Sequence, residues 1–352
     1  MKTLRTTLSV IILAITQVAV FAESEVAAPD DLLVNSGAIT LGLHGNDRGV
    51  RGMGDAFIPV SPLESGLLFI NPRVSLNDDG EEEFNFGVGV RSLVFDDQMI
   101  LGGNVFYDTR WSTYNNRFEQ VGAGLEMLSR WFDARANYYY PDDKKDVTAS
   151  STTTSSSSST RTSLGTPFVS GSSILQRRRR VTETTTTTRT FETYETALEG
   201  FDAEVGARVP VLTDLATTRV FVGYQRYETP FGSDLDGWKG RVEVRIGEGL
   251  LLDAEVFENE LLNQADFFVG ARLRLPFSAG NLLSGKNPFE GASEAFKPAP
   301  TVLAARLGEM VVRDMNIRLD GSSSIENPSK GSETTDQVSR TDILTIGTVP
   351  PP

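Results

Sequence analysis

Apolar and polar residues alternate along residues 101–141, and the alternation divides this stretch into three short segments. Within 101–108, 121–127 and 132–140 every second residue is apolar, aromatic or glycine, and polar or turn-forming residues separate the segments. A period of two is typical of a β-strand with one apolar and one polar face, because successive side chains point to opposite sides. A helix would scatter the same residues around its circumference. We therefore predict three consecutive strands here.

The same period of two recurs in nine further segments. No connection between them holds a pattern long enough for a crossover helix, which predicts antiparallel neighbours joined by hairpins. A soluble β-sandwich would place one strand face in a packed core and would seldom line the other face with so many charges. The combination predicts an all-β fold, a transmembrane antiparallel up-and-down β-barrel of about 12 strands with a polar lumen, at residues 37–277. The nine further segments are 37–45, 53–60, 66–76, 84–90, 201–211, 220–224, 238–246, 250–256 and 267–277.

The lengths of the connections agree with a barrel in an outer membrane. If the first strand starts in the periplasm, the turns after even strands face the periplasm and the loops after odd strands face outside. The even turns are all short, whereas the odd loops include the long segment 144–196, as outer-membrane barrels require. Pro72, inside 66–76, predicts a bulged or irregular strand.

Residues 144–196 consist mainly of serine and threonine. Such a composition offers little apolar surface to offset the entropy of ordering, so we predict a disordered, low-complexity extracellular loop. Its charge run is interpreted as solvated, with a possible role as a polyanion contact through Arg177, Arg178, Arg179 and Arg180. After the last strand, residues 278–318 are predicted as an extended linker, in which 302–313 forms a short amphipathic helix or strand, and residues 319–352 as a disordered tail.

The first 22 residues have the pattern of a secretory signal peptide. Lys2 and Arg5 precede an apolar run from Leu8 to Phe21, and Ala22 offers a cleavage point. The run is short for a membrane span, and an acidic leader follows at 23–36. We expect export through the Sec pathway to the outer membrane of a Gram-negative-type cell envelope.

Composition excludes several classes of function. The chain of 352 residues has no cysteine and one histidine, which excludes disulfides, cysteine-based metal sites and histidine clusters. The net charge of −14 argues against a nucleic-acid partner, which needs a basic surface. His44 has no nucleophile elbow near it, and no phosphate-binding or dinucleotide motif occurs, so we expect neither an enzyme nor a cofactor.

Charged residues of both signs fall on the face predicted to line the lumen. Pairs two residues apart, such as Asp202 with Glu204, share a face by strand geometry alone and need no catalytic role. Mixed signs suit a pore filled by water or by a threaded peptide better than a strongly ion-selective channel. Tyr107, Trp111, Tyr138, Tyr140, Trp238 and Phe277 are predicted to face outward as interface girdles. The predicted lumen-lining charges are Asp133, Arg135, Asp202, Glu204, Arg208, Lys239, Arg241, Glu243, Arg245, Asp253, Glu255, Arg272 and Arg274.

The run from Gly102 to Pro141 resembles the β-domain of inverse autotransporters, the intimin and invasin group. The similar features are an NxFYD element, a glycine-rich strand with a glutamate, a short turn and an NYY strand end, and the stretch from Gly200 also looks like the second half of that domain. The resemblance covers roughly 34–277. The matching positions are Asn104, Phe106, Tyr107, Asp108, Gly122, Gly124, Glu126, Asn137, Tyr138 and Tyr139.

The resemblance implies a twelve-stranded outer-membrane barrel whose C-terminal linker runs back out through the pore and carries an adhesin passenger. The final strand is similar to the signal read by the outer-membrane assembly machinery, at Gly270, Leu273, Leu275 and Phe277, although Phe268 departs from the usual polar residue. No peptidoglycan-binding module fits between Ala22 and Val34, and no immunoglobulin-like passenger fits after Phe277. We therefore expect the passenger to be absent or truncated.

Three hypotheses of function follow. The first is an outer-membrane anchor and translocator β-domain with 278–318 as the pore linker. The second is a stand-alone pore or structural barrel, and the third is a surface adhesin acting through the long loop. The expected partners are outer-membrane lipid, the assembly machinery, periplasmic chaperones and a host or cell-surface ligand.

Overall fold

The computed structural model describes most of the chain as two compact units. It describes residues 37–46, 49–63, 65–210, 216–232, 234–259, 264–278, 281, 284–290, 292–297, 303–314 and 316–350. One unit comprises residues 1–145 and 196–320, and the other comprises 146–195 and 321–352. The predicted signal peptide (1–22) and leader (23–36) lie outside the described residues. No helix in the described part of the chain has the length and apolarity to cross a membrane.

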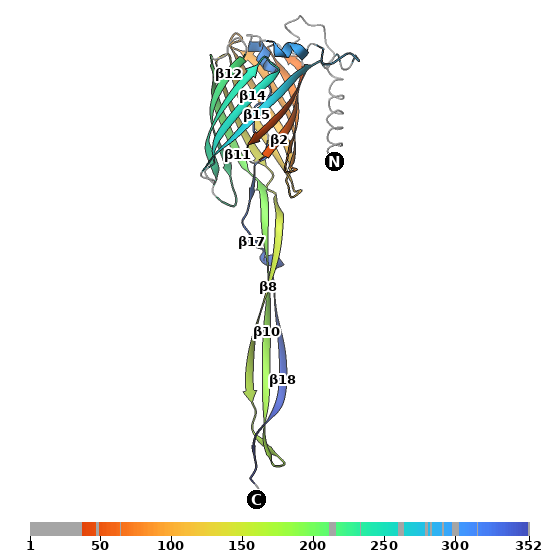
Figure 1. The fold of residues 1–352 in the computed structure, drawn as a ribbon, viewed down its shortest axis with the longest axis vertical. Coiled ribbons are helices and arrows are strands. Elements are labelled where there is room, and N and C mark those ends of the chain that lie inside the picture. Colours follow the sequence, from red (N-terminus) through yellow and green to blue (C-terminus); the bar gives the residue numbers. More distant parts are fainter. Residues whose placement is uncertain are drawn as a thin grey trace. The chain divides into compact units, whose positions relative to one another are not determined.

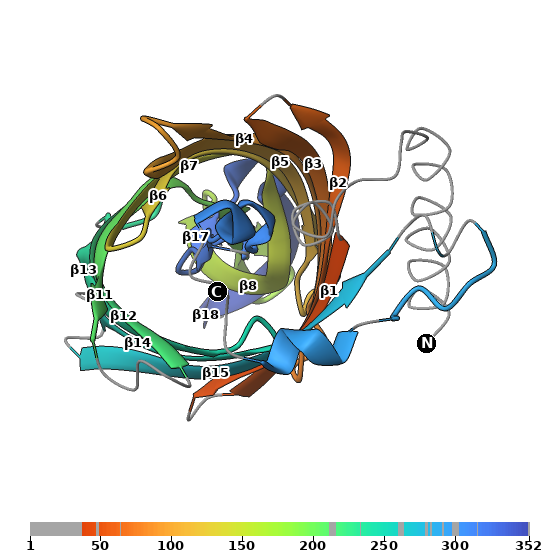
Figure 2. The same cartoon turned by 90° about the horizontal axis from the view of Figure 1, so that it is seen from above.

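The first unit contains a closed barrel of twelve antiparallel strands (Figures 1 and 2). Neighbours along the chain are neighbours in the barrel, and β1 closes it by pairing with β15, from Gly37 opposite Phe277 to Gly45 opposite Val269. All twelve predicted strands are confirmed. The barrel strands are β1 (Gly37–Asn46), β2 (Gly49–Leu63), β3 (Gly66–Asn77), β4 (Glu82–Val94), β5 (Met99–Trp111), β6 (Arg117–Ser129), β7 (Phe132–Pro141), β11 (Glu199–Val209), β12 (Ala216–Glu228), β13 (Leu235–Ile246), β14 (Leu250–Asn259) and β15 (Gln264–Phe277).

The irregularity predicted at Pro72 is found in the pairing of β2 with β3. The ladder is interrupted between the pairs Asp55–Arg73 and Ile58–Ile70, which lie on either side of Pro72, and its register shifts between Pro59 and Ser61. Proline lacks a backbone N–H, so it cannot donate to the neighbouring strand. Pairing of β3 with β4 continues through Pro72, which lies opposite Phe86.

Two short 3-10 helices follow the last barrel strand. The first, η2 (Ala292–Phe296), lies against the β13–β14 turn, where the N–H groups of Glu248 and Gly249 donate to Ala295 O at 2.7 Å. Gly247 in this turn has φ of +59°, and a Cβ there would lie 2.4 Å from Ala295 O, so glycine is required for both conformation and space. The second, η3 (Leu303–Gly308), covers part of the amphipathic segment predicted at 302–313.

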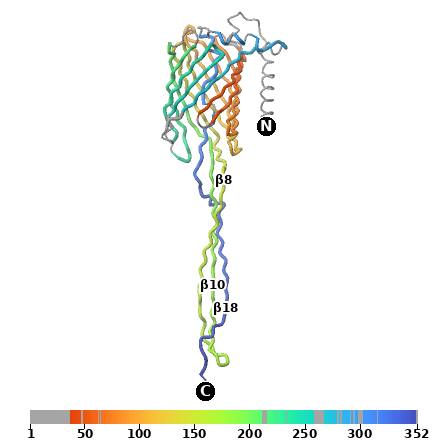
Figure 3. Tube along the Cα trace, in the orientation of Figure 1, coloured from red at the N-terminus to blue at the C-terminus, as the bar shows by residue number. Residues whose placement is uncertain are grey.

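The second unit is a sheet of long strands where the composition predicted a disordered loop and tail. Its strands are β8 (Lys145–Leu164), β9 (Phe168–Ser170), β10 (Ser173–Ala197), β16 (Leu319–Gly321), β17 (Ile325–Glu326) and β18 (Ser332–Thr348), with η4 (Pro328–Lys330) before the last. We call β8, β10 and β18 the Ser/Thr sheet. β10 pairs with β18 from Ser173–Thr348 to Thr188–Ser332 and with β8 on its other side (Figure 3).

The physical reason for this difference lies in the backbone and in threonine. Threonine is β-branched and favours extended conformations, and a strand ladder satisfies the backbone groups without any apolar core. Hydroxyl pairs add to the ladder, among them Ser158 with Thr184 at 2.9 Å and Thr160 with Thr182 at 3.0 Å. Nearly all side chains of β8 and β18 are exposed, so apolar burial contributes little to this sheet.

Candidate functional site

A segment of the chain after the last barrel strand lies inside the barrel, as Figure 2 shows. We call residues 303–314 and 316–318 the lumen segment. At one end of the barrel, Arg306 donates to Ser129 O, next to the β6–β7 turn. At the other end, Leu198 N, just before β11, donates to Arg318 O at 2.9 Å. The lumen segment therefore crosses the barrel from the end with the short turns to the opposite end.

Apolar contacts hold the first part of the lumen segment. Leu307 and Val311, 2% and 1% exposed, belong to a buried cluster with wall residues. Burial of such side chains stabilises by about 1.5–3 kcal/mol each. The lumen is therefore packed rather than water-filled at this end. The wall members of the cluster are Phe57, Leu67, Phe69, Ile100, Phe106 and Leu128.

Ion pairs form a closed ring that includes two residues of the lumen segment. Arg306 donates two hydrogen bonds of 2.8 Å to Asp133 on β7 and two, of 2.7 and 3.0 Å, to Glu309. Glu309 in turn pairs with Arg245 on β13 at 2.6 Å. The remaining pairs run along the wall at 2.6–3.7 Å, and each charge in the ring has an oppositely charged neighbour on both sides. In order, the ring is Asp133, Arg306, Glu309, Arg245, Glu243, Arg241, Glu204, Arg135 and Asp133 again.

Four arginines of the wall bind backbone carbonyl groups of the lumen segment. Arg91 donates from Nη1 to Leu307 O at 2.8 Å and also to Glu309 O. Arg73 donates to Val311 O at 2.5 Å, Arg274 to Gly308 O at 2.8 Å and Arg110 to Ile317 O. These contacts follow the segment along its length. They satisfy the backbone of an extended chain that has no strand partner of its own.

Wall carboxylates orient two of the central guanidinium groups. Glu126 accepts from Arg91 Nε at 2.6 Å and from Nη2 at 3.0 Å, a bidentate pair in which the arginine is 0% exposed. Asp108 accepts from Arg313 of the lumen segment at 2.8 and 2.6 Å. Bidentate arginine–carboxylate pairs fix geometry as well as energy.

Small and aromatic residues of the wall shape the space around Arg313. Its guanidinium lies 4.5 Å from the ring centroid of Phe106 and 5.3 Å from that of Tyr139. A Cβ on Gly122 would lie 2.4 Å from Arg313 Nη2. A glycine at this position of β6 therefore makes room for the arginine.

The last part of the lumen segment is held by a tyrosine and two acidic residues. Asp314 N donates to Tyr139 Oη at 2.8 Å, and that hydroxyl donates to Asp202 at 2.5 Å. Ile317 N donates to Glu83 Oε1 at 3.2 Å. Ile317 is also buried against Phe118. Each of these contacts again reaches the backbone of the segment or covers it.

A polar cavity of about 480 Å³ remains in the lumen beside the segment. Wall strands β1, β2 and β12–β15 line one side of it, and residues of the lumen segment line the other. His44 accepts from Arg272 Nε at 2.9 Å in its wall, and Arg272 also pairs with Asp253 at 3.1 Å. Groups of three or more metal-ligating side chains do not occur among the described residues. The arrangement suits the holding of a polypeptide better than a chemical reaction.

Comparison with known families agrees with this geometry. The family model described as the inverse autotransporter β-domain matches residues 31–234, more than half of the chain. The chain belongs to this family. As an inverse autotransporter β-domain it is an outer-membrane β-barrel that serves as an anchor and translocator. Outer-membrane lipid surrounds such a barrel.

Solved structures share the fold of this inverse autotransporter β-domain. A chain solved in work on the in-meso crystallization of membrane proteins is 16% identical, with a TM-score of 0.53 over 82% of this chain and 100% of that one. The translocator domain of the autotransporter NalP from Neisseria meningitidis gives 10% identity and a TM-score of 0.29, over 68% and 79% of the two chains. Omp33 from Acinetobacter baumannii gives 9% and 0.33, over 68% and 98%. No curated protein matches the chain.

The structure places most of the predicted lumen charges in the lumen of the β-domain. Seven belong to the ion-pair ring or adjoin it, whereas Arg208 lies over Trp131, with 5.8 Å between guanidinium and ring centroid, and is not part of the ring. Arg274 binds the lumen segment, and Lys239 pairs with Asp202 at 3.5 Å. The ring includes or adjoins Asp133, Arg135, Asp202, Glu204, Arg241, Glu243 and Arg245, and the polar cavity is lined by Asp253, Glu255 and Arg272.

The predicted assembly signal and arginine run lie elsewhere. In β15, Leu273 is 38% exposed, but Phe277 is 5% exposed and packs with Ala56 and Ile58, so its predicted place among the outward aromatics is wrong. Its ring fills the space beside Gly37, where a Cβ would lie 2.6 Å away. Gly270 packs against His44 and Asp253, and Leu275 lies opposite Ile39. In β10, Arg178 and Arg180 share Asp342 of β18, Arg179 donates to Ser339 and Arg177 lies over Phe168.

Several residues that bind the lumen segment were not among the predicted site residues. Wall members such as Arg91, Asp108 and Glu126 carry the period-two signal, since they fall on the face opposite the apolar residues. Asp108, Gly122, Glu126, Asn137 and Tyr139 also belong to the family motif, and all of them contact the segment or orient a residue that does. The motif therefore marks the wall against which the segment lies.

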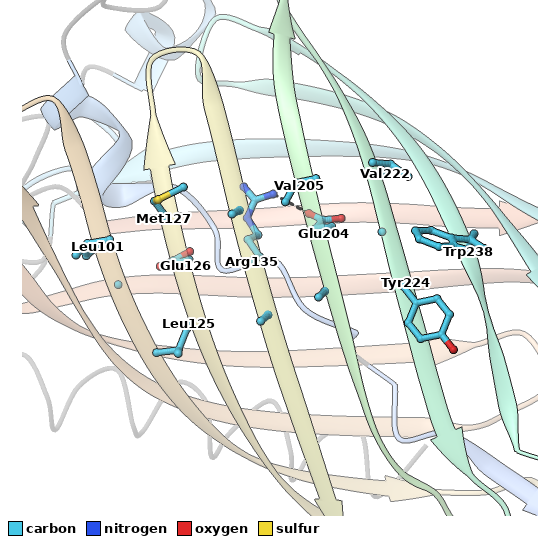
Figure 4. A pocket seen from close by; sticks show the side chains of 15 residues that line it. Leu101, Leu125, Glu126, Met127, Arg135, Glu204, Val205, Val222, Tyr224 and Trp238 are labelled. Carbon is cyan, nitrogen blue, oxygen red and sulfur yellow. Dashed lines mark hydrogen bonds and ion pairs between the residues drawn. The ribbon is translucent and has the colours of Figure 1, made fainter.

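The outer face of the β-domain carries an apolar groove of about 600 Å³ (Figure 4). Ala134, Ala136 and Ala203 form part of its lining, and Leu125 and Trp238, 71% and 61% exposed, stand beside them. Arg135 and Glu204 also border it, but they pair with each other at 2.8 Å. The groove is continuous with the lipid-facing surface of the barrel.

Proposed function

We propose that this inverse autotransporter β-domain passes its own C-terminal segment through the barrel and then keeps residues 303–318 in the lumen as a plug and tether. The observation that carries the proposal is the way the wall binds the segment. Arg73, Arg91, Arg110 and Arg274 donate to backbone carbonyl groups. Backbone contacts do not depend on side-chain identity, so the same arginines can receive successive parts of a moving chain.

Side-chain contacts give the final position of the plug. Arg306, Glu309 and Arg313 are the residues of the lumen segment whose charges pair with wall residues. A different part of the chain in the lumen would present other side chains and would lose these pairs. We infer that the ion-pair ring and the pair of Arg313 with Asp108 arrest the segment at 303–318.

A surface-labelling experiment tests the direction of passage. An epitope tag placed after Pro352 is stained on intact cells and on cells whose outer membrane has been permeabilised. The proposal expects equal staining in both samples. A tag that is reached only after permeabilisation would overturn it. A tag in the 23–36 leader is the matched control and is expected to be reached only in permeabilised cells.

The polar cavity beside the plug favours one alternative, a stand-alone pore that conducts around the segment. Planar-bilayer recordings separate the two functions. For a plug, replacing Arg306 and Arg313 by alanine raises the conductance several-fold, because the segment no longer fills the lumen. For a stand-alone pore, deletion of all residues after Phe277 leaves the conductance unchanged.

Partners of finer identity follow from the same proposal. An exported barrel of this family requires periplasmic chaperones and the outer-membrane assembly machinery, and we propose the end of β15, at Gly270, Leu273, Leu275 and Phe277, as the segment that the machinery reads. Replacing Phe277 by alanine is expected to slow assembly, measured as the heat-modifiable band on gels. The role of residues 144–196 as a binding surface for a host or cell-surface ligand remains a separate hypothesis, tested by deleting them and measuring adhesion.

A further inference from the structure

Strand β8 leaves one of its edges without a partner strand. Within the described residues, β10 pairs with β8 on one side and with β18 on the other, so β8 and β18 are the outer strands of the Ser/Thr sheet. An outer edge presents a row of backbone N–H and C=O groups that pair either with water or with another strand. At 20 residues, β8 is long for such an edge.

The two outer strands differ in their protection against pairing. Natural edge strands carry charges, prolines or bulges that prevent a second chain from adding to the sheet. β18 carries Glu333, Asp336, Arg340 and Asp342. Between residues 147 and 160, β8 carries neither a charged residue nor a proline. Of the two edges, that of β8 is therefore the one open to another strand.

Contacts within the sheet show what kind of strand fits β8. Its hydroxyl groups pair with those of β10 in a row, from Thr152 with Thr190 at 3.4 Å to Thr160 with Thr182 at 3.0 Å. The residue numbers rise on one strand as they fall on the other, so this pairing is antiparallel. A Ser/Thr strand thus accepts an antiparallel Ser/Thr strand beside it. A second copy of β8 has this composition, and over residues 147–160 it brings no charge, although the chain has a net charge of −14.

We propose that the free edge of β8 is a homotypic interface, at which the β8 strands of two copies of this chain pair antiparallel. The twofold relation is self-complementary, because each residue meets its counterpart on the other copy. The result is one continuous sheet of both copies, formed by strand addition. Since β8 is polar on both faces, its register is weakly specified, and the interface tolerates a shift of the two strands. This interaction is independent of the passage of the chain through the barrel.

Charge substitution on the edge tests the proposal. The full-length chain is reconstituted with one copy per lipid nanodisc, and the association of two discs is measured by analytical ultracentrifugation. The variant Ser155→Lys/Ser157→Lys brings like charges together in an antiparallel pair and is expected to weaken association at least tenfold. Ser155→Ala/Ser157→Ala is the matched control and associates like the parent chain. Thr335→Lys/Thr341→Lys, on β18, also leaves association intact.

Single outcomes contradict the proposal directly. Association that survives the β8 lysines, or that is lost with the β18 lysines, would assign the interface to another surface. Absence of association in the parent chain over the micromolar range would remove it altogether.

Cross-linking gives a second readout that does not depend on how the lysine variant folds. The chain has no cysteine, so a single one can be introduced without interference. Ser156→Cys is expected to form a disulfide-linked dimer on mild oxidation, whereas Thr335→Cys on β18 is not. A dimer formed only by Thr335→Cys, or by neither variant, overturns the assignment to β8.

Discussion

The lumen of the barrel and the Ser/Thr sheet use the same antiparallel pairing but differ in what their side chains add. In the lumen, buried charges such as Arg91 and Asp108 pair with particular partners, and each strand has one face of each kind. In the Ser/Thr sheet, residues such as Ser158 meet similar residues on both faces. A change in the lumen leaves a buried group without its partner, whereas a change in the sheet is compensated by water. The difference teaches that register and position are encoded by side chains in the first region and by the backbone in the second.

The largest effect is expected from Arg91→Ala. It removes the bidentate partner of Glu126, which is 6% exposed, and the donors to Leu307 O and Glu309 O. Breaking a buried ion pair by removing one partner costs about 3–5 kcal/mol. The free energy of unfolding in urea, measured for the domain in lipid vesicles, checks this value. The double variant Arg91→Ala/Glu126→Ala is expected to recover part of the loss, and no recovery would mean that the pair is not coupled.

A smaller effect is expected from Gly122→Val, which acts through space rather than charge. Its side chain would overlap Arg313 and push the lumen segment from the wall, at a cost of about 1–3 kcal/mol as for overpacking in cores. Faster amide hydrogen exchange at residues 309–314 would report the displacement. Gly103→Ala is the matched control, since the nearest atom to its new Cβ lies 3.7 Å away. Equal exchange in the two variants would contradict the close approach at Gly122.

Charge does matter at one place in the second unit, and pH tests it. Hydrogen bonds from Lys330, from Asn327 at 2.7 Å and from Tyr194 at 2.7 Å lower the pKa of Glu192 from 4.5 to about 2. A depressed pKa means that the contribution to stability is complete above pH 4.5 and disappears as the pH falls towards 2. Hydrogen exchange at 325–331 should therefore accelerate over that interval. In Glu192→Gln the exchange is expected to be fast at neutral pH and to change little on acidification.

The smallest effect is expected from Ser158→Ala in the hydroxyl row. The pair with Thr184 is exposed, so water replaces the lost hydroxyl, and the change in stability should stay within about 0.5 kcal/mol. Thermal unfolding of the second unit, followed by circular dichroism, measures it. A loss above 1 kcal/mol would show that hydroxyl pairs, rather than the backbone, hold this sheet together.

The barrel could be predicted from the sequence because its signal is local. Each strand must present apolar residues to lipid and polar residues to the lumen, and that requirement leaves a period of two in every segment. The Ser/Thr sheet leaves no such signal, because both of its faces are wet. Its pairing of β10 with β18 joins residues such as Arg178 and Asp342, which lie far apart in the sequence.

The candidate site could be predicted in its wall but not in its plug. Glu204 and Arg241 stand on strands whose alternation points them inward, so their place in the lumen follows from parity. Arg306 and Arg313 lie in a segment without a regular period, and nothing local indicates that they meet Asp133 and Asp108. The family resemblance added what parity could not, since it implied that a linker passes through the pore.

The course of the lumen segment has a mechanical consequence. Its contacts with the wall are spread in a row along the barrel axis, from Arg306 to Arg318. A force applied to the chain beyond Arg318 would load that row in shear, so the contacts would resist together instead of yielding one after another. The domain would then hold whatever hangs from its C-terminal side with the combined strength of the row, and a single substitution among these contacts would lower the rupture force by less than its share of equilibrium stability suggests.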